Sequence, residues 1–66
     1  MSIVKVIEVI AEGATVEDAI KAAVKEACKT LDGVLQVNVE HIEALVEKNK
    51  VVKFRVNCKL SFLVMN

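Results

Sequence analysis

The chain is short, apolar and electrically balanced, and these properties exclude several classes of protein. It has 66 residues, 55% of them apolar, and nine Lys and Arg balance nine Asp and Glu, for a net charge of +0. Nucleic-acid binders usually carry a basic excess and stacking aromatic residues, whereas this chain has neither, with no Trp, no Tyr and two Phe. No apolar run approaches the roughly 20 residues of a membrane span, so we expect no membrane insertion.

The size and apolar content together predict self-association. A domain this small buries only about 60% of the surface of its unfolded chain, yet the mean hydropathy is +0.48. Two Cys and one His argue against stabilisation by disulfides or a metal, which leaves oligomerisation. Met1 to Ile10 lacks the cationic start and cleavage site of a signal peptide. We therefore expect a cytoplasmic protein in a reducing compartment, where both cysteines stay thiols.

The first segment, Ser2 to Glu12, predicts a strand that is covered on both sides. It is dense in β-branched residues, and both its even and its odd positions are mostly apolar. Gly13 then ends the strand.

An amphipathic helix follows. Thr15 is a suitable N-cap, Glu17 and Asp18 place negative charge in the first turn, and Glu17 is spaced to pair with Lys21. Gly33 provides the stop, through a left-handed cap. Apolar residues recur at helical spacing along one face: Val16, Ala19, Ile20, Ala23, Val24, Ala27, Cys28 and Leu31.

Two long strands, Leu35 to Lys48 and Lys50 to Val64, are joined at Asn49. The second alternates regularly, with apolar residues at the even positions from Val52 to Val64. The first alternates until His41, where the apolar residues change from odd to even positions. This change predicts a bulge or a switch of the buried face near His41.

The element order is therefore β-α-β-β, with a right-handed crossover if the first strand is parallel to its neighbour. A helix of about 16 residues covers roughly 24 Å, whereas strands of about 14 residues run roughly 45 Å. One helix leaves part of the hairpin bare, and we expect Phe62 or Val64 to be exposed. Exposed apolar surface of this kind favours a closed, self-complementary assembly.

The chain resembles the dodecin family over essentially its whole length. The strings that carry the resemblance are Lys5-Val-Ile-Glu-Val9, Val16-Glu-Asp-Ala-Ile20, Lys29-Thr-Leu31 and Val56-Asn-Cys-Lys-Leu-Ser-Phe62. The resemblance implies an α+β fold, in which residues 1–66 form a single dodecin-like domain with a three-stranded antiparallel curved sheet wrapped around one helix. It also implies a hollow homododecamer.

Most dodecins bind flavins between tryptophans at two-fold interfaces, which makes FMN, FAD or riboflavin the expected ligand. Gln36 stands at the place of the family's tryptophan, and Arg55 at that of a glutamine that contacts the flavin edge. Both departures weaken the expected flavin contacts, because Gln36 offers no aromatic face. If Gln36 and Arg55 share one face of neighbouring strands, they would line one pocket for a planar or anionic ligand. The alternative for Arg55 is a solvated or salt-bridged residue on the polar sheet face.

Other chemistry is limited. In a strand, Glu43 and Glu47 share the face of His41, whereas Glu40 does not, and a metal site within one subunit is not expected. Dodecin-like proteins without the tryptophan are linked to calcium, and copies of Glu8, Glu40 and Glu43 could gather it on a symmetry axis. Cys28 and Cys58 are expected to pack as small hydrophobic residues, without a redox role.

No catalytic motif is present, so we expect a protein that is not an enzyme. The preferred hypothesis is a small-ligand binding and storage protein, with pockets at the interfaces of a homododecamer. The alternatives are a calcium-binding shell, or a purely structural oligomer without a ligand.

Overall fold

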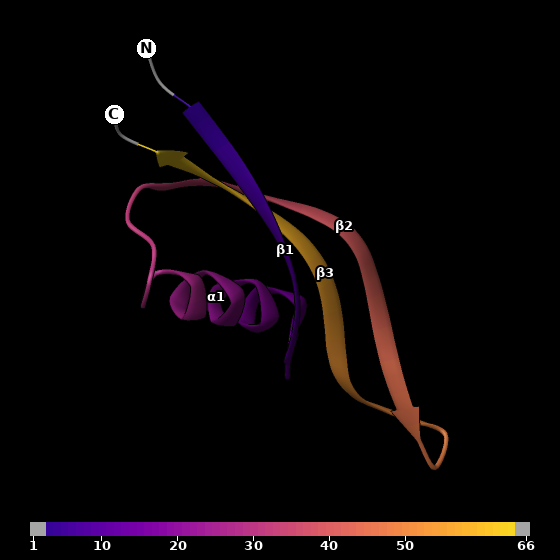
Figure 1. Cartoon of the computed structure of the whole chain (residues 1–66). Helices are drawn as coiled ribbons and strands as arrows, with labels where there is room; N and C mark the ends of the chain where they lie inside the picture. The colour runs from indigo at the N-terminus through magenta and orange to yellow at the C-terminus, as the bar shows by residue number, and fades with distance from the viewer. Residues whose placement is uncertain (1–2, 65–66) are drawn as a thin grey trace.

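One helix packs on one face of a single antiparallel sheet (Figure 1). The computed structural model describes residues 3–64. The sheet has the order β1-β3-β2, so β3 is central and antiparallel to both neighbours, which confirms the α+β expectation. Because β1 is antiparallel to its neighbour, the condition for a right-handed crossover is not met. The elements are β1 (Ile3–Gly13), α1 (Val16–Ala27), β2 (Val34–Glu47) and β3 (Lys50–Val64).

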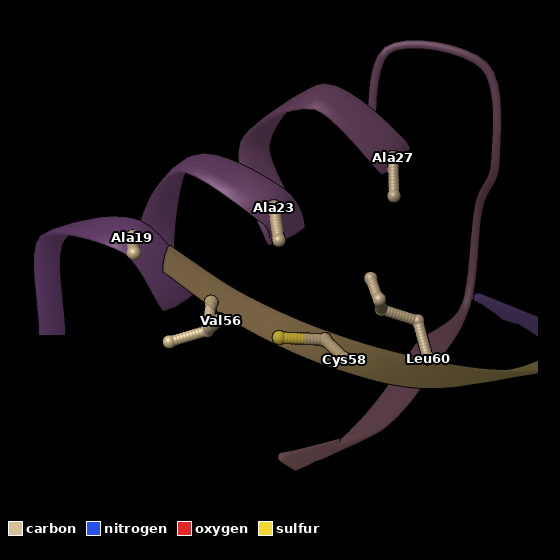
Figure 2. Close-up of a cluster of buried hydrophobic side chains, with 6 residues drawn as sticks. All are labelled: Ala19, Ala23, Ala27, Val56, Cys58 and Leu60. Carbon is tan, nitrogen blue, oxygen red and sulfur yellow. The ribbon is translucent and has the colours of Figure 1, made fainter. Parts of the chain in front are cut away.

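The core lies where β3 meets α1. The predicted alternation of β3 is confirmed, since its even positions face the helix there (Figure 2). The buried helix residues are all alanines, which lets α1 lie close to the sheet, and Val16, Ile20 and Val24 pack around them. Six residues form this buried cluster: Ala19, Ala23, Ala27, Val56, Cys58 and Leu60.

The helix begins as predicted and ends earlier than predicted. The hydroxyl of Thr15 accepts a hydrogen bond of 3.0 Å from the backbone N–H of Asp18, and Lys21 lies 2.9 Å from Glu17. The last helical residue is Ala27, whose carbonyl accepts from the N–H groups of Thr30 and Leu31 in a closing turn. Residues after Ala27 therefore leave the helical period.

The expectation that Cys28 packs on the apolar stripe is wrong. Cys28 is the C-cap of α1 and its side chain is exposed, because the helix ends just before it. The corresponding expectation for Cys58 is confirmed, since its side chain is fully buried beneath α1.

The bulge predicted near His41 is present. The register passes from Val39 opposite Cys58 to His41 opposite Asn57, which leaves Glu40 as the additional residue. Beyond the bulge, Ile42 lies opposite Val56, on the helix side of the sheet. The bulge therefore explains why the apolar residues of β2 change from odd to even positions.

The hairpin of β2 and β3 extends well beyond the helix (Figure 1). The described chain is 52 Å long, whereas the 12 residues of α1 span roughly 18 Å. The prediction that Phe62 or Val64 is bare is wrong, because both are partly buried. Ala19 lies over Val56 and Ala27 over Leu60 (Figure 2), so α1 covers the half of β3 away from the hairpin turn. Bare apolar residues lie at both ends of the sheet. At the hairpin turn, Val46 is 59%, Val51 56% and Val52 46% exposed; at the opposite end, Ile3 is 47%, Val4 52% and Leu35 60% exposed.

Candidate functional site

The polar side chains of the sheet gather on the face opposite α1, which we call the open face. Because Val56, Cys58 and Leu60 point to the helix, the residues between them point away from it. Strand pairing then fixes the cross-strand neighbours on this face. From the three strands it comprises Val4, Val6, Glu8, Ile10 and Glu12 of β1, Arg55, Asn57, Lys59 and Ser61 of β3, and Gln36, Asn38, His41 and Glu43 of β2.

A groove of about 290 Å³ opens on this face. We call it the Arg55 groove; five of its lining residues, Ile10, His41, Glu43, Arg55 and Asn57, are on the open face, and the sixth, Ile42, lies between His41 and Glu43 on β2. Two cross-strand rows form it. The first row consists of Ile10, Asn57 and His41. In the second row, Arg55 lies between Glu12 of β1 and Glu43 of β2. The groove therefore combines an apolar wall, a cation and hydrogen-bonding groups.

Glu12 holds Arg55 in place. The Arg55 Nε and Nη2 atoms donate hydrogen bonds of 3.0 and 2.9 Å to Glu12 Oε2, and Lys53 Nζ lies 2.8 Å from Glu12 Oε1. The hydrogen bond from Lys53, followed by that from Arg55, lowers the pKa of Glu12 below 4.5. Glu12 is thus an ionised carboxylate at neutral pH, shared by two cations.

A second ion pair lies on the open face. Lys59 Nζ is 3.0 Å from Glu40 Oε1, and Asn38 Nδ2 donates a hydrogen bond of 3.2 Å to Glu40 Oε2. The hydrogen bond from Lys59 lowers the pKa of Glu40, and the same bond raises the pKa of Lys59. On the other side of Lys59, its register partner is Glu8.

The carboxylates considered for calcium do not gather within one chain. Glu8 and Glu40 lie on either side of Lys59, whereas Glu43 lies opposite Arg55. Among residues 3–64, no three His, Cys, Asp or Glu side chains converge in a way that could hold a metal ion. Each of these carboxylates has a lysine or arginine as a neighbour.

The sequence analysis named Arg55, which lines the groove, but not two of its neighbours, Asn57 and Glu12. Asn57 is flanked by Ile10 and His41, and its buried Oδ1 atom accepts no hydrogen bond from residues 3–64. Glu12 contacts Arg55 across 43 positions of sequence. Only the pairing of β1 with β3 brings them together, so no local sequence signal indicates this contact.

A family model described as dodecin matches residues 3–65, nearly the whole chain. The chain belongs to the dodecin family. It superposes on an arginine-to-alanine variant of dodecin from Thermus thermophilus with a TM-score of 0.93 at 24% identity, covering 100% of both chains. Against dodecin from Streptomyces coelicolor the TM-score is 0.91 at 26% identity, covering 98% of this chain and 94% of the other.

The likeness extends to a further crystal structure, of a Thermus thermophilus protein, with a TM-score of 0.93 at 24% identity over 100% of this chain and 98% of the other. No match is found among curated proteins. Within residues 3–64, no helix of this dodecin is long and apolar enough to cross a membrane.

Gln36 and Arg55, which the resemblance led us to expect at the flavin contacts, share the open face but lie apart in one chain. Gln36 is opposite Ser61, and Arg55 is six positions from Ser61 along β3, or roughly 20 Å of strand. Gln36 is exposed, and Arg55 lines the groove. In a dodecin of this sequence, a pocket that contains both residues requires two chains.

Proposed function

We propose that this dodecin is a non-enzymatic, cytoplasmic binding and storage protein that assembles into a hollow homododecamer. A small planar ligand, with flavin as the first candidate, is held at interfaces between copies. The observation that carries the proposal is the large apolar surface that one chain leaves uncovered, in a member of this family.

Two separate regions of the chain need cover. The hairpin end exposes Val46 and Val51, beyond the part of β3 that α1 covers, and β1 exposes Val4 and Ile10 on the open face at 52% and 64%. A further groove of about 590 Å³ runs between β1 and α1, with a mainly apolar lining that includes Val9, Ala23 and Ala27. Exposed apolar residues that cluster in this way are typical of protein–protein interfaces.

The assembly is tested by the mass in solution. Light scattering after size exclusion should give about 86 kDa, twelve times the chain mass of 7.2 kDa. A stable, folded monomer in dilute buffer would contradict the proposal, because the uncovered apolar residues would then need no partner.

Flavin binding is tested by fluorescence. Gln36 and Arg55 lie roughly 20 Å of strand apart in one chain. A pocket that contains both residues can therefore form only at an interface between chains, and flavin binding should require the assembly. Adding the assembled protein to micromolar riboflavin should quench the fluorescence of the riboflavin. Unchanged fluorescence would reject flavin as the ligand while leaving the assembly intact.

Restoring the family's contacts should strengthen flavin binding. The double variant Gln36→Trp, Arg55→Gln adds an aromatic platform and the amide that the family uses at the ring edge. We expect its Kd for riboflavin to fall at least about tenfold, because one added stacked ring pair stabilises the complex by about 1.4 kcal/mol. The matched control is Asn38→Trp, on the same face of β2 and two positions from Gln36. An equal gain in the control would show that Gln36 is not at the flavin site.

The two alternatives give different results in a thermal melt. Calcium binding should raise the melting temperature, and a chelator should reverse the increase. Such a site would have to displace Lys59 from Glu40, or recruit Glu8 and Glu43 from neighbouring copies. Insensitivity to flavin and calcium alike would leave a purely structural oligomer.

A further inference from the structure

The charges around Arg55 are already balanced by the chain itself. Arg55 lies directly between Glu12 on β1 and Glu43 on β2 in the register of the sheet. Lys53 is the second cation of this group, and it also contacts Glu12. Two carboxylates therefore face two cations, and the bonds from Lys53 and Arg55 lower the pKa of Glu12 still further below neutral pH.

Some of the hydrogen-bond donors of Arg55 are already engaged by Glu12. Its Nε and one Nη2 hydrogen both point to Glu12 Oε2, at 3.0 and 2.9 Å. A guanidinium has five N–H donors, so the Nη1 edge keeps free donors. This edge can donate to a ring carbonyl without the loss of either bond to Glu12.

An anion would meet a different environment from an uncharged ligand. A phosphate in the Arg55 groove would approach the Glu43 carboxylate in the groove wall and Glu12 behind Arg55. It would have to compete with Glu12 for the guanidinium. An uncharged ring suffers no such repulsion and gains contact with Ile10, whose side chain is 64% exposed.

We infer that Glu12 determines ligand charge in the Arg55 groove: by engaging Arg55 and Lys53, it makes the groove a site for an uncharged planar ligand and excludes anions. The inference rests on the proposed function for the identity of the ring. Glu12 acts through Arg55 and is a positioning residue.

Two flavins with the same ring and different charge test the inference. Riboflavin is uncharged, whereas FMN carries a phosphate. The assembled wild-type protein should bind riboflavin more tightly than FMN. Glu12→Gln should lower the ratio of the FMN Kd to the riboflavin Kd by about five- to tenfold, as expected when one negative charge near a dianion is removed. Glu12→Ser, which also removes the carboxylate, should give the same change.

The matched control is Glu8→Gln. Glu8 is on the same face of β1, four positions from Glu12, or roughly 13 Å of strand. The Glu8→Gln variant changes the net charge by the same amount as Glu12→Gln but leaves the Glu12–Arg55 hydrogen bonds intact. An equal shift of the ratio in Glu8→Gln would overturn the inference, because the effect would then be one of overall charge.

A probe without a flavin ring separates this inference from the proposed function. Titration with inorganic phosphate, followed by the NMR signal of the Arg55 Nε–H group, should leave wild type and Glu8→Gln unchanged and shift the signal in Glu12→Gln. If neither flavin binds but the phosphate result holds, the flavin proposal fails and the role of Glu12 stands. Millimolar phosphate that shifts the wild-type signal as strongly as that of Glu12→Gln would overturn the inference.

Discussion

The two thiols occupy opposite environments although both follow an apolar pattern in the sequence. Cys28 is exposed at the C-cap of α1, whereas Cys58 is fully buried against the alanines of the helix. Burial also raises the pKa of the Cys58 thiol, because the thiolate loses its hydration. The reactive thiolate form is therefore both rare and inaccessible at Cys58.

We expect one fast thiol per chain. At about pH 8, a chromogenic disulfide reagent should modify Cys28 in native protein, and Cys58 should react only after denaturant unfolds the chain. The variant Cys28→Ser should lose the fast phase and keep the slow one. Two thiols reacting at equal rates in native protein would contradict the placement of Cys58.

Gly13 is the residue at which β1 turns directly into the start of α1. A Cβ atom at this position would lie 2.6 Å from the backbone nitrogen of Ala19 and 3.0 Å from its Cα. Both are backbone atoms of a buried helical residue, so relief requires a shift of the helix itself.

Gly13→Ala should therefore lower the free energy of unfolding by about 1–3 kcal/mol, the usual range for overpacking. The measurement is a urea titration at fixed protein concentration, followed by circular dichroism. Ala14→Ser adds one heavy atom at the adjacent exposed position and should change the midpoint little. A stable Gly13→Ala protein with an unchanged midpoint would show that α1 does not approach the strand as closely as described.

At the scale of elements, the sequence predicts strands better than it predicts the helix end. The bounds of β3 agree with the prediction because its apolar residues alternate without interruption. The helix ends four residues before Leu31, and the prediction runs too far because Cys28 and Leu31 keep the helical spacing after the chain has turned. Spacing reports which face a residue would occupy, and not where the backbone leaves the helix.

In the candidate site, too, the sequence indicated some features and not others. The change of alternation near His41 revealed the bulge, and the family resemblance indicated Gln36 and Arg55. The contact of Glu12 with Arg55 depends on which strand lies next to β1, and the sequence left that neighbour open. Alternation places a side chain on a face, whereas the strand order decides its neighbours.

The ion pairs of the open face make the sheet sensitive to acid. Glu12 and Glu40 have folded-state pKa values below 4.5, so their pairs stabilise the fold above about pH 4.5, the value expected in the unfolded chain. This stabilisation is lost as the pH falls from that value through the folded pKa values. The contribution is small, because the side chains are partly exposed and solvent screens them.

The double variant Glu12→Gln, Glu40→Gln should accordingly show a smaller loss of stability than wild type between about pH 5 and pH 3. Urea midpoints at each pH provide the measurement. Glu47→Gln, at the hairpin turn, removes a carboxylate away from these pairs and should keep the wild-type slope. A double variant that loses stability as steeply as wild type would show that these pairs do not contribute.

On the scale of the whole molecule, the chain is too thin to hide its apolar residues. Residues 3–64 measure 52 × 20 × 13 Å and bury six hydrophobic residues, three of which are alanines. The sequence predicted this deficit from apolar content and from the short helix. The residues it named, Phe62 or Val64, are partly buried, whereas Ile3, Val4 and Leu35 near them are exposed, as are Val46, Val51 and Val52 at the hairpin turn.

A charge at the uncovered hairpin end should therefore break the assembly. Val46 is 59% exposed and is the last residue but one of β2, next to the hairpin turn. Val46→Asp should reduce the mass in solution from about 86 kDa towards that of one chain or a few chains, because a buried unpaired carboxylate at an interface costs several kcal/mol. The control is Asn49→Asp, which adds the same charge at the turn, where the backbone has a φ of 66° that Asp tolerates. If Val46→Asp keeps the wild-type mass, the hairpin end does not contact another copy, and the cover for these residues must come from a different partner.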